Sequence, residues 1–318
     1  MNELSEANYT EVTEFILVGL SHQPKSQIIF FCILLHLYLG TIVGNTFIIM
    51  VVWKEPRLHT PMYFFLCNLS FVDLCSTTTL VPLALVNCLR DCPTITYNDC
   101  FAQMTISIFW STTECWLLVV MAYDRFVAIS NPLHYAVIMT MRACFQITAT
   151  MWISSFLLAL LPVVTVPLRF CAGHNVVNHF ACEVEAILKL VCSDTTVSEI
   201  LMWINSIFIM PLPFLFILLS YIRILVAVLK IPSTAGRRKA FSTCGSHLTV
   251  VTIYYGTLIS IYLKPQNKDS MDQDKIIFLF YGIVIPMMNP PIYTLRNKDM
   301  IGALRKVAGR TKRVRLSV

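Results

Sequence analysis

Two acidic residues, Asp73 and Glu114, lie inside long apolar stretches of the sequence. A carboxyl group in an apolar environment is costly unless it is paired, hydrogen-bonded or protonated. One interpretation is that each carboxyl is protonated and bonded to a neighbouring helix. The other is that the two share a proton or a cation, because close carboxylates do not both ionise cheaply without a positive charge between them. Asn45 and Asn289 are polar residues that can complete such a cluster.

An acid and a base, Asp124 and Arg125, stand side by side at the end of the third apolar stretch. Such a pair is either an ordinary surface ion pair or a local latch, in which the aspartate holds the arginine until a partner protein takes it.

Three prolines, Pro286, Pro290 and Pro291, interrupt the seventh apolar stretch. Each lacks a backbone N–H and favours a kink. A kinked helix with Asn289 beside the break can shift between two arrangements.

The elements that position these residues are seven apolar stretches. The chain has 318 residues, of which 56% are hydrophobic and 13% charged, whereas soluble domains carry about 25% charged residues. A helix needs roughly 20 residues to span the hydrocarbon core of a bilayer. The stretches are Ile28–Val52, Tyr63–Leu85, Phe101–Ala128, Ala143–Val166, Val197–Leu229, His247–Leu263 and Ile276–Tyr293.

Stretches of this length predict helices, because every backbone group in lipid must be satisfied within its own segment. Strands of a membrane barrel are only about ten residues long and alternate in polarity. The sequence therefore predicts an all-α membrane protein, a bundle of seven transmembrane helices. We expect the polar segment Lys239–Ser246 to continue the sixth helix into the cytosol.

Basic residues set the expected orientation. With the amino terminus outside, most of the 24 Lys and Arg residues fall in cytoplasmic segments, as the positive-inside rule requires. The net charge of +6 then reflects the orientation of the chain in the membrane and predicts no nucleic-acid partner. We expect a multi-pass plasma-membrane protein with a cytoplasmic carboxyl terminus. The sequon at Asn8 lies on the extracellular side and predicts a glycan there.

Three regions follow from this topology: an extracellular segment over 1–27, the seven-helix domain over 28–296, and a cytoplasmic segment over 297–318. The last is predicted to be an amphipathic helix with a basic tail on the inner leaflet, where it meets anionic lipid. Its apolar residues on one face are Met300, Ile301, Leu304 and Val307.

Five cysteines fall on the oxidising, outer side of the expected membrane: Cys92, Cys100, Cys171, Cys182 and Cys192. Any four cysteines allow three pairings, and their spacing does not choose between them. No pair has the spacing of zinc ligands with matching histidines. The outer segment Pro167–Thr196, which holds three of them, is expected to cap the bundle.

Short motifs, one for each of several expected helices, resemble those of vertebrate odorant receptors, a rhodopsin-like family of G-protein-coupled receptors. The motifs are Gly44-Asn45, Leu58-His59-Thr60-Pro61-Met62-Tyr63-Phe64-Phe65-Leu66, Met121-Ala122-Tyr123-Asp124-Arg125-Phe126-Val127-Ala128-Ile129, Lys239-Ala240-Phe241-Ser242-Thr243-Cys244 and Pro286-Met287-Met288-Asn289-Pro290-Pro291-Ile292-Tyr293. The departures are mild: Phe126 replaces the usual Tyr, Ser130 the usual Cys and Thr294 the usual Ser. Phe126 lacks a hydroxyl at the face that meets the G protein, which puts the efficiency of coupling in question.

The resemblance implies two disulfides, Cys100–Cys182 and Cys171–Cys192, and no enzymatic activity. It implies a sodium-type site at Asp73 and Glu114, and no other cofactor. It also implies that Arg125, Tyr221 and Tyr293 rearrange on activation and open a cytoplasmic cavity for a stimulatory, olfactory-type G protein, which raises cyclic AMP. The residues expected to serve coupling and activation are Asp124, Arg125, Tyr221, His247, Asn289, Pro290 and Tyr293.

An odorant pocket is predicted in the outer half of the bundle, between the third, fifth and sixth helices. Residues at helical spacing indicate it: Met104, Ile108, Ser111 and Thr112; Met202, Asn205, Ser206 and Ile209; Tyr255, Leu258, Ile259 and Tyr262. Such stripes also occur in plain helix cores. These residues are mainly apolar, with a few hydroxyls and one amide. Ser107 stands where similar receptors for amines carry an acid. We therefore expect a small, neutral, volatile ligand with one hydrogen-bonding group.

The alternative function is that of a seven-helix channel or transporter, which would favour inverted repeats or more charges along a pore. A retinal protein would need a lysine midway along the seventh helix, and Lys275 lies at its outer edge. An intramembrane enzyme would have only Asp73 and Glu114 as a catalytic pair.

Overall fold

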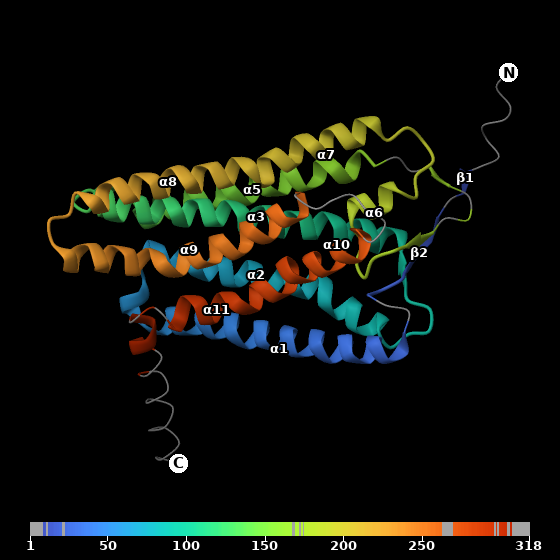
Figure 1. Cartoon of the computed structure of the whole chain (residues 1–318), viewed down its shortest axis with the longest axis horizontal. Helices are drawn as coiled ribbons and strands as arrows, with labels where there is room; N and C mark the ends of the chain where they lie inside the picture. The colour runs from blue at the N-terminus through green and yellow to red at the C-terminus, as the bar shows by residue number, and fades with distance from the viewer. Residues whose placement is uncertain are drawn as a thin grey trace, which may run out of the picture.

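The computed structural model describes residues 9–10, 12–20, 23–166, 169–171, 173, 175–262, 270–295, 297, 299–303 and 306. Its long helices run along one axis of an elongated bundle (Figure 1). Short strands and α6 (Val184–Leu188) gather at one end, here called the outer end, and α11 (Ile285–Leu295) lies toward the other, here called the inner end. The prediction of an all-α, seven-helix membrane protein is confirmed.

Each apolar stretch forms a helix or a pair of helices. These are α1 (Pro24–Lys54), α2 (Pro61–Asn87), α3 (Tyr97–Ser130), α5 (Met141–Val164), α7 (Thr196–Ile209) with α8 (Pro211–Leu229), α9 (Thr234–Tyr262), and α10 (Ser270–Leu279) continued by η3 (Phe280–Val284) and α11 (Ile285–Leu295). Helix α3 is central and contacts α2, α5, α8 and α9.

Six helical segments of the described chain are long and apolar enough to cross a membrane. The exception is α9, which begins at Thr234 and includes the basic residues Arg237 and Arg238. The polar segment Lys239–Ser246 therefore does continue the sixth helix, and this polar half lowers its mean hydropathy. Lipid is the natural surrounding of the other helices, since Trp53 is 80% and Trp203 68% exposed.

The fifth span is divided into two helices at Met210, which the sequence did not predict. Pro211 begins α8 and lacks the N–H that would continue the backbone ladder of α7. Met210 has φ of −119° and ψ of −70°, away from the helical values. The break lies just beyond Ile209, so the outer segment α7 carries the predicted pocket residues of this span.

The seventh span changes from α-helix to a π-helical turn at Phe280–Val284 and back to α-helix at Ile285. The π turn precedes Pro286 and inserts an extra residue into the helix, a feature common at functional sites. The sequence predicted irregularity at the prolines, and the structure places it one turn earlier.

Helix α1 packs closely on α11 at Gly44. A Cβ atom at this position would lie 2.9 Å from Cγ of Pro290, so only glycine allows this approach. The next residue, Asn45, donates from Nδ2 to the carbonyl oxygen of Pro286 at 3.1 Å. The Gly44-Asn45 motif therefore fixes α1 against the proline-rich part of the seventh span.

Strands cover the outer end of the bundle. Strand β2 (Glu14–Leu17) lies between β3 (Thr94–Thr96), which is antiparallel to it, and β5 (Val176–Val177), which is parallel. Strand β1 (Tyr9–Thr10) pairs with β4 (Phe170–Cys171). The amino-terminal segment and the second outer loop are thus joined in small sheets, and the loop caps the bundle as predicted. Asn8 lies outside the described residues.

The inner end carries two short elements, η2 (Pro56–Leu58) and α4 (Tyr135–Ile138). A helical turn follows the seventh span, in which the Asn297 side chain accepts bonds from the N–H groups of Asp299 and Met300. Met300 is buried, and Lys306 lies 3.3 Å from a Glu55 carboxylate oxygen. Leu304 and Val307 lie outside the described residues, so the interfacial helix stays a prediction beyond this turn.

Candidate functional site

A cavity of about 200 Å³ lies in the outer half of the bundle. Its wall is formed by α2, α3, α5, α7, the seventh span and the second outer loop. The lining residues are Ser76, Leu80, Met104, Ser107, Ile108, Ser111, Glu114, Pro162, Cys182, Glu183, Val184, Glu185, Met202, Asn205, Ser206, Ile209, Phe278, Tyr281 and Gly282. The volume is below the roughly 300–1,000 Å³ of sites for drug-sized ligands, so the cavity suits a small molecule.

Seven predicted pocket residues lie in this wall. On α3 these are Met104, Ile108 and Ser111, spaced four and three residues apart on one helix face. On α7 they are Met202, Asn205, Ser206 and Ile209. Both helix faces therefore line one space.

The predicted residues of the sixth helix do not line the cavity in the described part of the chain. Tyr255 is buried, with its ring 5.0 Å from that of Phe214 and 5.4 Å from that of Tyr254. The Tyr254 hydroxyl lies 3.2 Å from Sγ of Cys115. These rings fill the space between α3, α8 and α9, and the cavity opens toward the seventh span instead.

The other predicted residues have different positions. Leu258 and Ile259 are half-buried on α9, and Thr112 is fully buried beside the lining residue Ser111. The side chain of Tyr262 lies outside the described residues. Helical spacing identifies residues that share one face of a helix, but it does not fix how far α9 is rotated relative to its neighbours.

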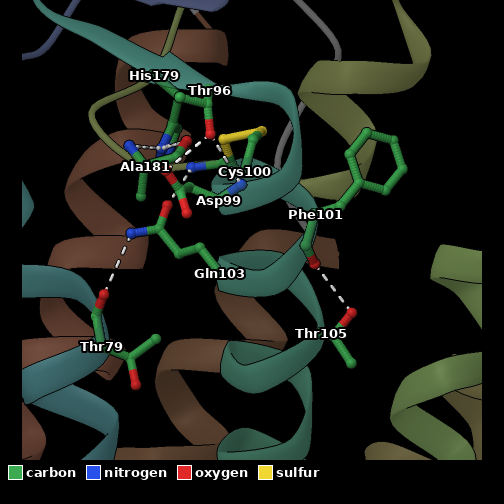
Figure 2. Close-up of a disulfide and its surroundings, with 10 residues drawn as sticks. Thr79, Thr96, Asp99, Cys100, Phe101, Gln103, Thr105, His179 and Ala181 are labelled. Atoms are coloured by element: carbon green, nitrogen blue, oxygen red, sulfur yellow. Dashed lines mark hydrogen bonds between the residues drawn. A yellow bond between two sulfur atoms is a disulfide. The ribbon is translucent and has the colours of Figure 1, made fainter. Parts of the chain in front are cut away.

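The part of the second outer loop that lines the cavity, Cys182–Glu185, is called the roof. It is held by the disulfide Cys100–Cys182, which joins α3 to this loop. Gln103, one turn along α3, lies beside it (Figure 2). Its Oε1 accepts from the Cys182 N–H at 2.9 Å, and its Nε2 donates to the Thr79 carbonyl at 3.2 Å. Gln103 thus ties the roof to both α2 and α3.

The second disulfide, Cys171–Cys192, closes the loop on itself. Both disulfides are those that the resemblance implies. Cys92, the remaining outer cysteine, is free and exposed.

A buried histidine supports the same loop. Nδ1 of His179 accepts from the Ala181 N–H at 3.1 Å, and its Nε2 lies 3.8 Å from the Glu183 carboxylate. Burial lowers the pKa of the imidazole to about 4, because charging it there would forfeit hydration. The neutral ring stacks on Phe180 and meets Phe278 edge-on, which joins the loop to the seventh span.

Below the cavity lies the polar cluster that the sequence predicted. Asn289 Nδ2 donates to both Asp73 carboxylate oxygens, at 3.2 and 3.0 Å. Asp73, Asn289 and Asn45 are buried, and Glu114 lines the cavity directly above. One oxygen each of Glu114, Asn289 and Asn45 is buried without a hydrogen-bond partner among the described residues. Carboxylate and amide oxygens are ligands of hard cations, so this donor set fits sodium.

At the inner end, the Asp124 carboxylate accepts from the Tyr135 hydroxyl at 2.7 Å. In the described part of the chain no ion pair within 4 Å joins it to Arg125, so the predicted latch is not closed here. Consecutive helix residues point in different directions, which separates the two side chains. Arg125 is 8% exposed, and its Nε makes no hydrogen bond to the described residues.

The other inner residues connect α3, α8, α9 and α11. The Tyr221 hydroxyl lies 2.7 Å from Nδ1 of His247, whose Nε2 lies 3.1 Å from the Leu118 carbonyl oxygen. Ser246 on α9 donates to the Ile292 carbonyl oxygen at 2.9 Å. The buried Tyr293 hydroxyl has no partner among the described residues, and Pro290 lies inside α11. These hydrogen bonds join α9 to α3, α8 and α11.

Several residues of the site were not predicted from the sequence. Gln103 and the roof residues Glu183, Val184 and Glu185 were missed, as were Phe278, Tyr281 and Gly282 on the seventh span. The polarity of Gln103, one turn after a cysteine inside an apolar helix, was a signal. For the roof residues the signal was their place directly after Cys182, in the segment that the sequence predicted to cap the bundle.

Comparison with known proteins gives consistent matches over nearly the whole chain. The family described as "Olfactory receptor" matches residues 31–310. Human olfactory receptor 13H1 is 52% identical over 300 residues, which cover 94% of this chain and 97% of that protein. Human olfactory receptor 2G3 is 49% identical over 94% of this chain and 97% of its own length. Mouse olfactory receptor 8U3 is 46% identical over 95% of each chain. The chain is a multi-pass membrane protein that belongs to the olfactory receptor family.

Proposed function

We propose that this receptor binds a small, neutral volatile odorant in the outer cavity and activates a stimulatory, olfactory-type G protein, which raises cyclic AMP. The observation that carries the proposal is the cavity of about 200 Å³ between α3, α7 and the disulfide-anchored roof. Its wall combines apolar side chains with a few polar groups, as small-molecule sites do. The family is one of receptors and not of enzymes.

The orientation follows from the same proposal. The cavity, the disulfides and the paired amino-terminal strands lie at the extracellular end of a plasma-membrane protein. Arg125 and the pair Tyr221–His247 lie at the cytoplasmic end, where membrane lipid and the G protein are the partners.

Activation is a shift between two arrangements of the bundle. A ligand shifts this equilibrium only to the extent that it binds one arrangement more tightly. Two hydrogen bonds limit movement of the inner end of α9, Tyr221 to His247 and Ser246 to Ile292. Breaking them would let this end move outward and expose Arg125 to the G protein, which in turn would raise ligand affinity.

Sodium is a further proposed ligand, held by the carboxylates of Asp73 and Glu114 with the amide oxygens of Asn289 and Asn45. A cation there would offset the cost of two buried acids. It would favour the arrangement of the seventh span that keeps Asn289 beside Asp73, because the π-helical turn and Pro286 lie just before it.

The test is cyclic-AMP accumulation in cells that display the receptor, challenged with a broad panel of volatile molecules. Arg125→Ala, matched for surface level, is the control. We expect a ligand-dependent rise that the variant lacks. A rise of equal size in the variant, or ion flux across liposomes in place of a cyclic-AMP response, would contradict the proposal.

A further inference from the structure

Three polar side chains in the cavity wall carry oxygens that have no hydrogen-bond partner among the described residues. They are Ser107 and Glu114 on α3 and Asn205 on α7. Ser107 Oγ, Glu114 Oε1 and Asn205 Oδ1 are buried and make no hydrogen bond to the described residues. Ser107 and Glu114 are seven residues apart, or two helical turns, so they share a face of α3.

The oxygens of Glu114 and Asn205 accept hydrogen bonds, and the Ser107 hydroxyl can accept as well. A buried acceptor without a partner costs free energy. A ligand that donates a hydrogen bond would remove this cost, whereas a ligand that only accepts would leave these acceptors unsatisfied. Sites built to bond a ligand O–H discriminate strongly against analogues that lack it.

The charged groups in the wall disfavour an anionic ligand. The ionisable lining groups include Glu183 and Glu185 in the roof and Glu114 at the floor, and no Lys, Arg or His is among the described lining residues. A carboxylate ligand would meet only like charge there.

The remaining wall is suited to a hydrocarbon chain. Met104, Ile108, Met202 and Ile209 lie on the two facing helices, and Leu80 and Phe278 add further apolar surface. The volume of about 200 Å³ limits the ligand to a small one.

We propose that the ligand of this cavity is a small aliphatic alcohol, whose hydroxyl donates to Asn205 Oδ1 with Ser107 Oγ as a second acceptor, while its chain packs between α3 and α7. This inference rests on the proposed odorant function and specifies the chemical class of its ligand.

The test uses matched sets of probes with six to eight carbons, each set comprising a primary alcohol, the corresponding methyl ketone, the methyl ether and the carboxylate. Each probe is applied to cells that display the full-length receptor, and cyclic AMP is measured against concentration. We expect the alcohol to be at least about 10-fold more potent than the ketone and the ether, since one hydrogen bond is worth roughly that factor. The carboxylate should be inactive.

Two variants connect the preference to the cavity. Asn205→Leu removes the amide at similar size, and Ser107→Ala removes the hydroxyl. Each should lower the potency of the alcohol by about 10-fold while leaving the potency of the ketone nearly unchanged. The difference in potency between the two probes should therefore narrow. Ile108→Val is the matched control in the same wall and should shift both probes in parallel. Surface levels of all variants are measured with an amino-terminal epitope.

The outcomes separate the two proposals. Greater or equal potency of the ketone, ether or carboxylate overturns the alcohol assignment and leaves the odorant function standing. A ratio of alcohol potency to ketone potency that is unchanged in both Asn205→Leu and Ser107→Ala also overturns the alcohol assignment. A panel in which no probe acts on a receptor present at the surface counts against both.

Discussion

Gln103 joins three parts of the outer end through one side chain: α3, on which it lies, the Thr79 carbonyl of α2 and the Cys182 N–H of the roof. Its side chain is 7% exposed, so water does not replace a lost partner. The disulfide fixes Cys182 at one sulfur, and Gln103 fixes the orientation of its backbone.

We expect Gln103→Ala to lower odorant potency by about 10-fold, because the buried Cys182 N–H would lose its acceptor and the roof would lose its fixed position. Concentration–response curves of cyclic AMP measure this shift. Thr105→Ala is the control, since the Thr105 hydroxyl donates to the Phe101 carbonyl of its own helix at 2.9 Å (Figure 2). Equal potency of the two variants would show that Gln103 does not position the roof.

His179 predicts a pH dependence of the roof. Its pKa is lowered to about 4 in the folded loop and is about 6.5 when the chain is unfolded. The stabilising effect of burying the neutral ring is therefore complete above pH 6.5 and is lost as the pH falls toward 4. Glu183, Asp274 and Lys275 are the charged groups around the ring.

The corresponding measurement is the thermal stability of the purified receptor between pH 7 and pH 4. We expect a progressive loss in the native protein and a smaller loss in His179→Asn, which keeps an acceptor for the Ala181 N–H but does not titrate. Curves of the same shape would exclude His179 as the source.

At the scale of elements, the amino-terminal strand β2 acts as part of the roof. Phe15 and Leu17 are fully buried, and their apolar cluster includes the cavity residues Met104, Cys182 and Val184. The Phe15 ring meets Phe170 edge-on at 5.5 Å. Ile16, between them, points to the other face and is only half-buried.

Phe15→Ala should destabilise the roof by about 3–5 kcal/mol, the cost of truncating a buried aromatic side chain. Hydrogen–deuterium exchange of the loop 170–192 would show this as faster exchange. Ile16→Ala, on the opposite face of the same strand, should leave the exchange of the loop close to that of the native receptor. Unchanged exchange in Phe15→Ala would mean that the strand only rests on the loop.

These elements also show what the sequence can predict. The seven spans, the termini of most helices and the cavity faces of α3 and α7 follow from apolar length and helical spacing, which depend on local residues. The break at Met210 and the π-helical turn at Phe280–Val284 do not, because prolines permit several irregular geometries and packing selects one. The roof over the cavity depends on strand pairing between distant segments, such as Ile16 with Val176, that no local pattern encodes.

The whole molecule connects an outer cavity to an inner polar network through α3. Helix α3 carries Met104 and Ser111 in the cavity, Glu114 at its floor, and Asp124 and Arg125 at the inner end. The seventh span runs parallel to this path, from Tyr281 in the cavity wall through Asn289 beside Asp73 to Tyr293. A ligand can therefore influence the inner end through two helices at once.

Ser246→Ala tests the inner network, since it removes the hydrogen bond that holds α9 to the Ile292 carbonyl. We expect basal cyclic AMP to rise by about 5-fold, because a bond worth roughly 1 kcal/mol would no longer favour the inactive arrangement. Ser242→Ala, on the exposed face of the same helix, is the control and should leave basal activity unchanged. A basal level that does not rise in Ser246→Ala would show that this bond does not restrain α9.

The most direct test of ligand action through the outer cavity is the odorant response of Ser111→Trp, which places an indole ring in the space between α3 and α7. At a surface level equal to that of the native receptor, the cyclic-AMP response to an odorant that activates the native receptor should be lost, while basal cyclic AMP should stay the same. A full response with unchanged potency in this variant would contradict binding in the cavity and would place the ligand elsewhere on the receptor.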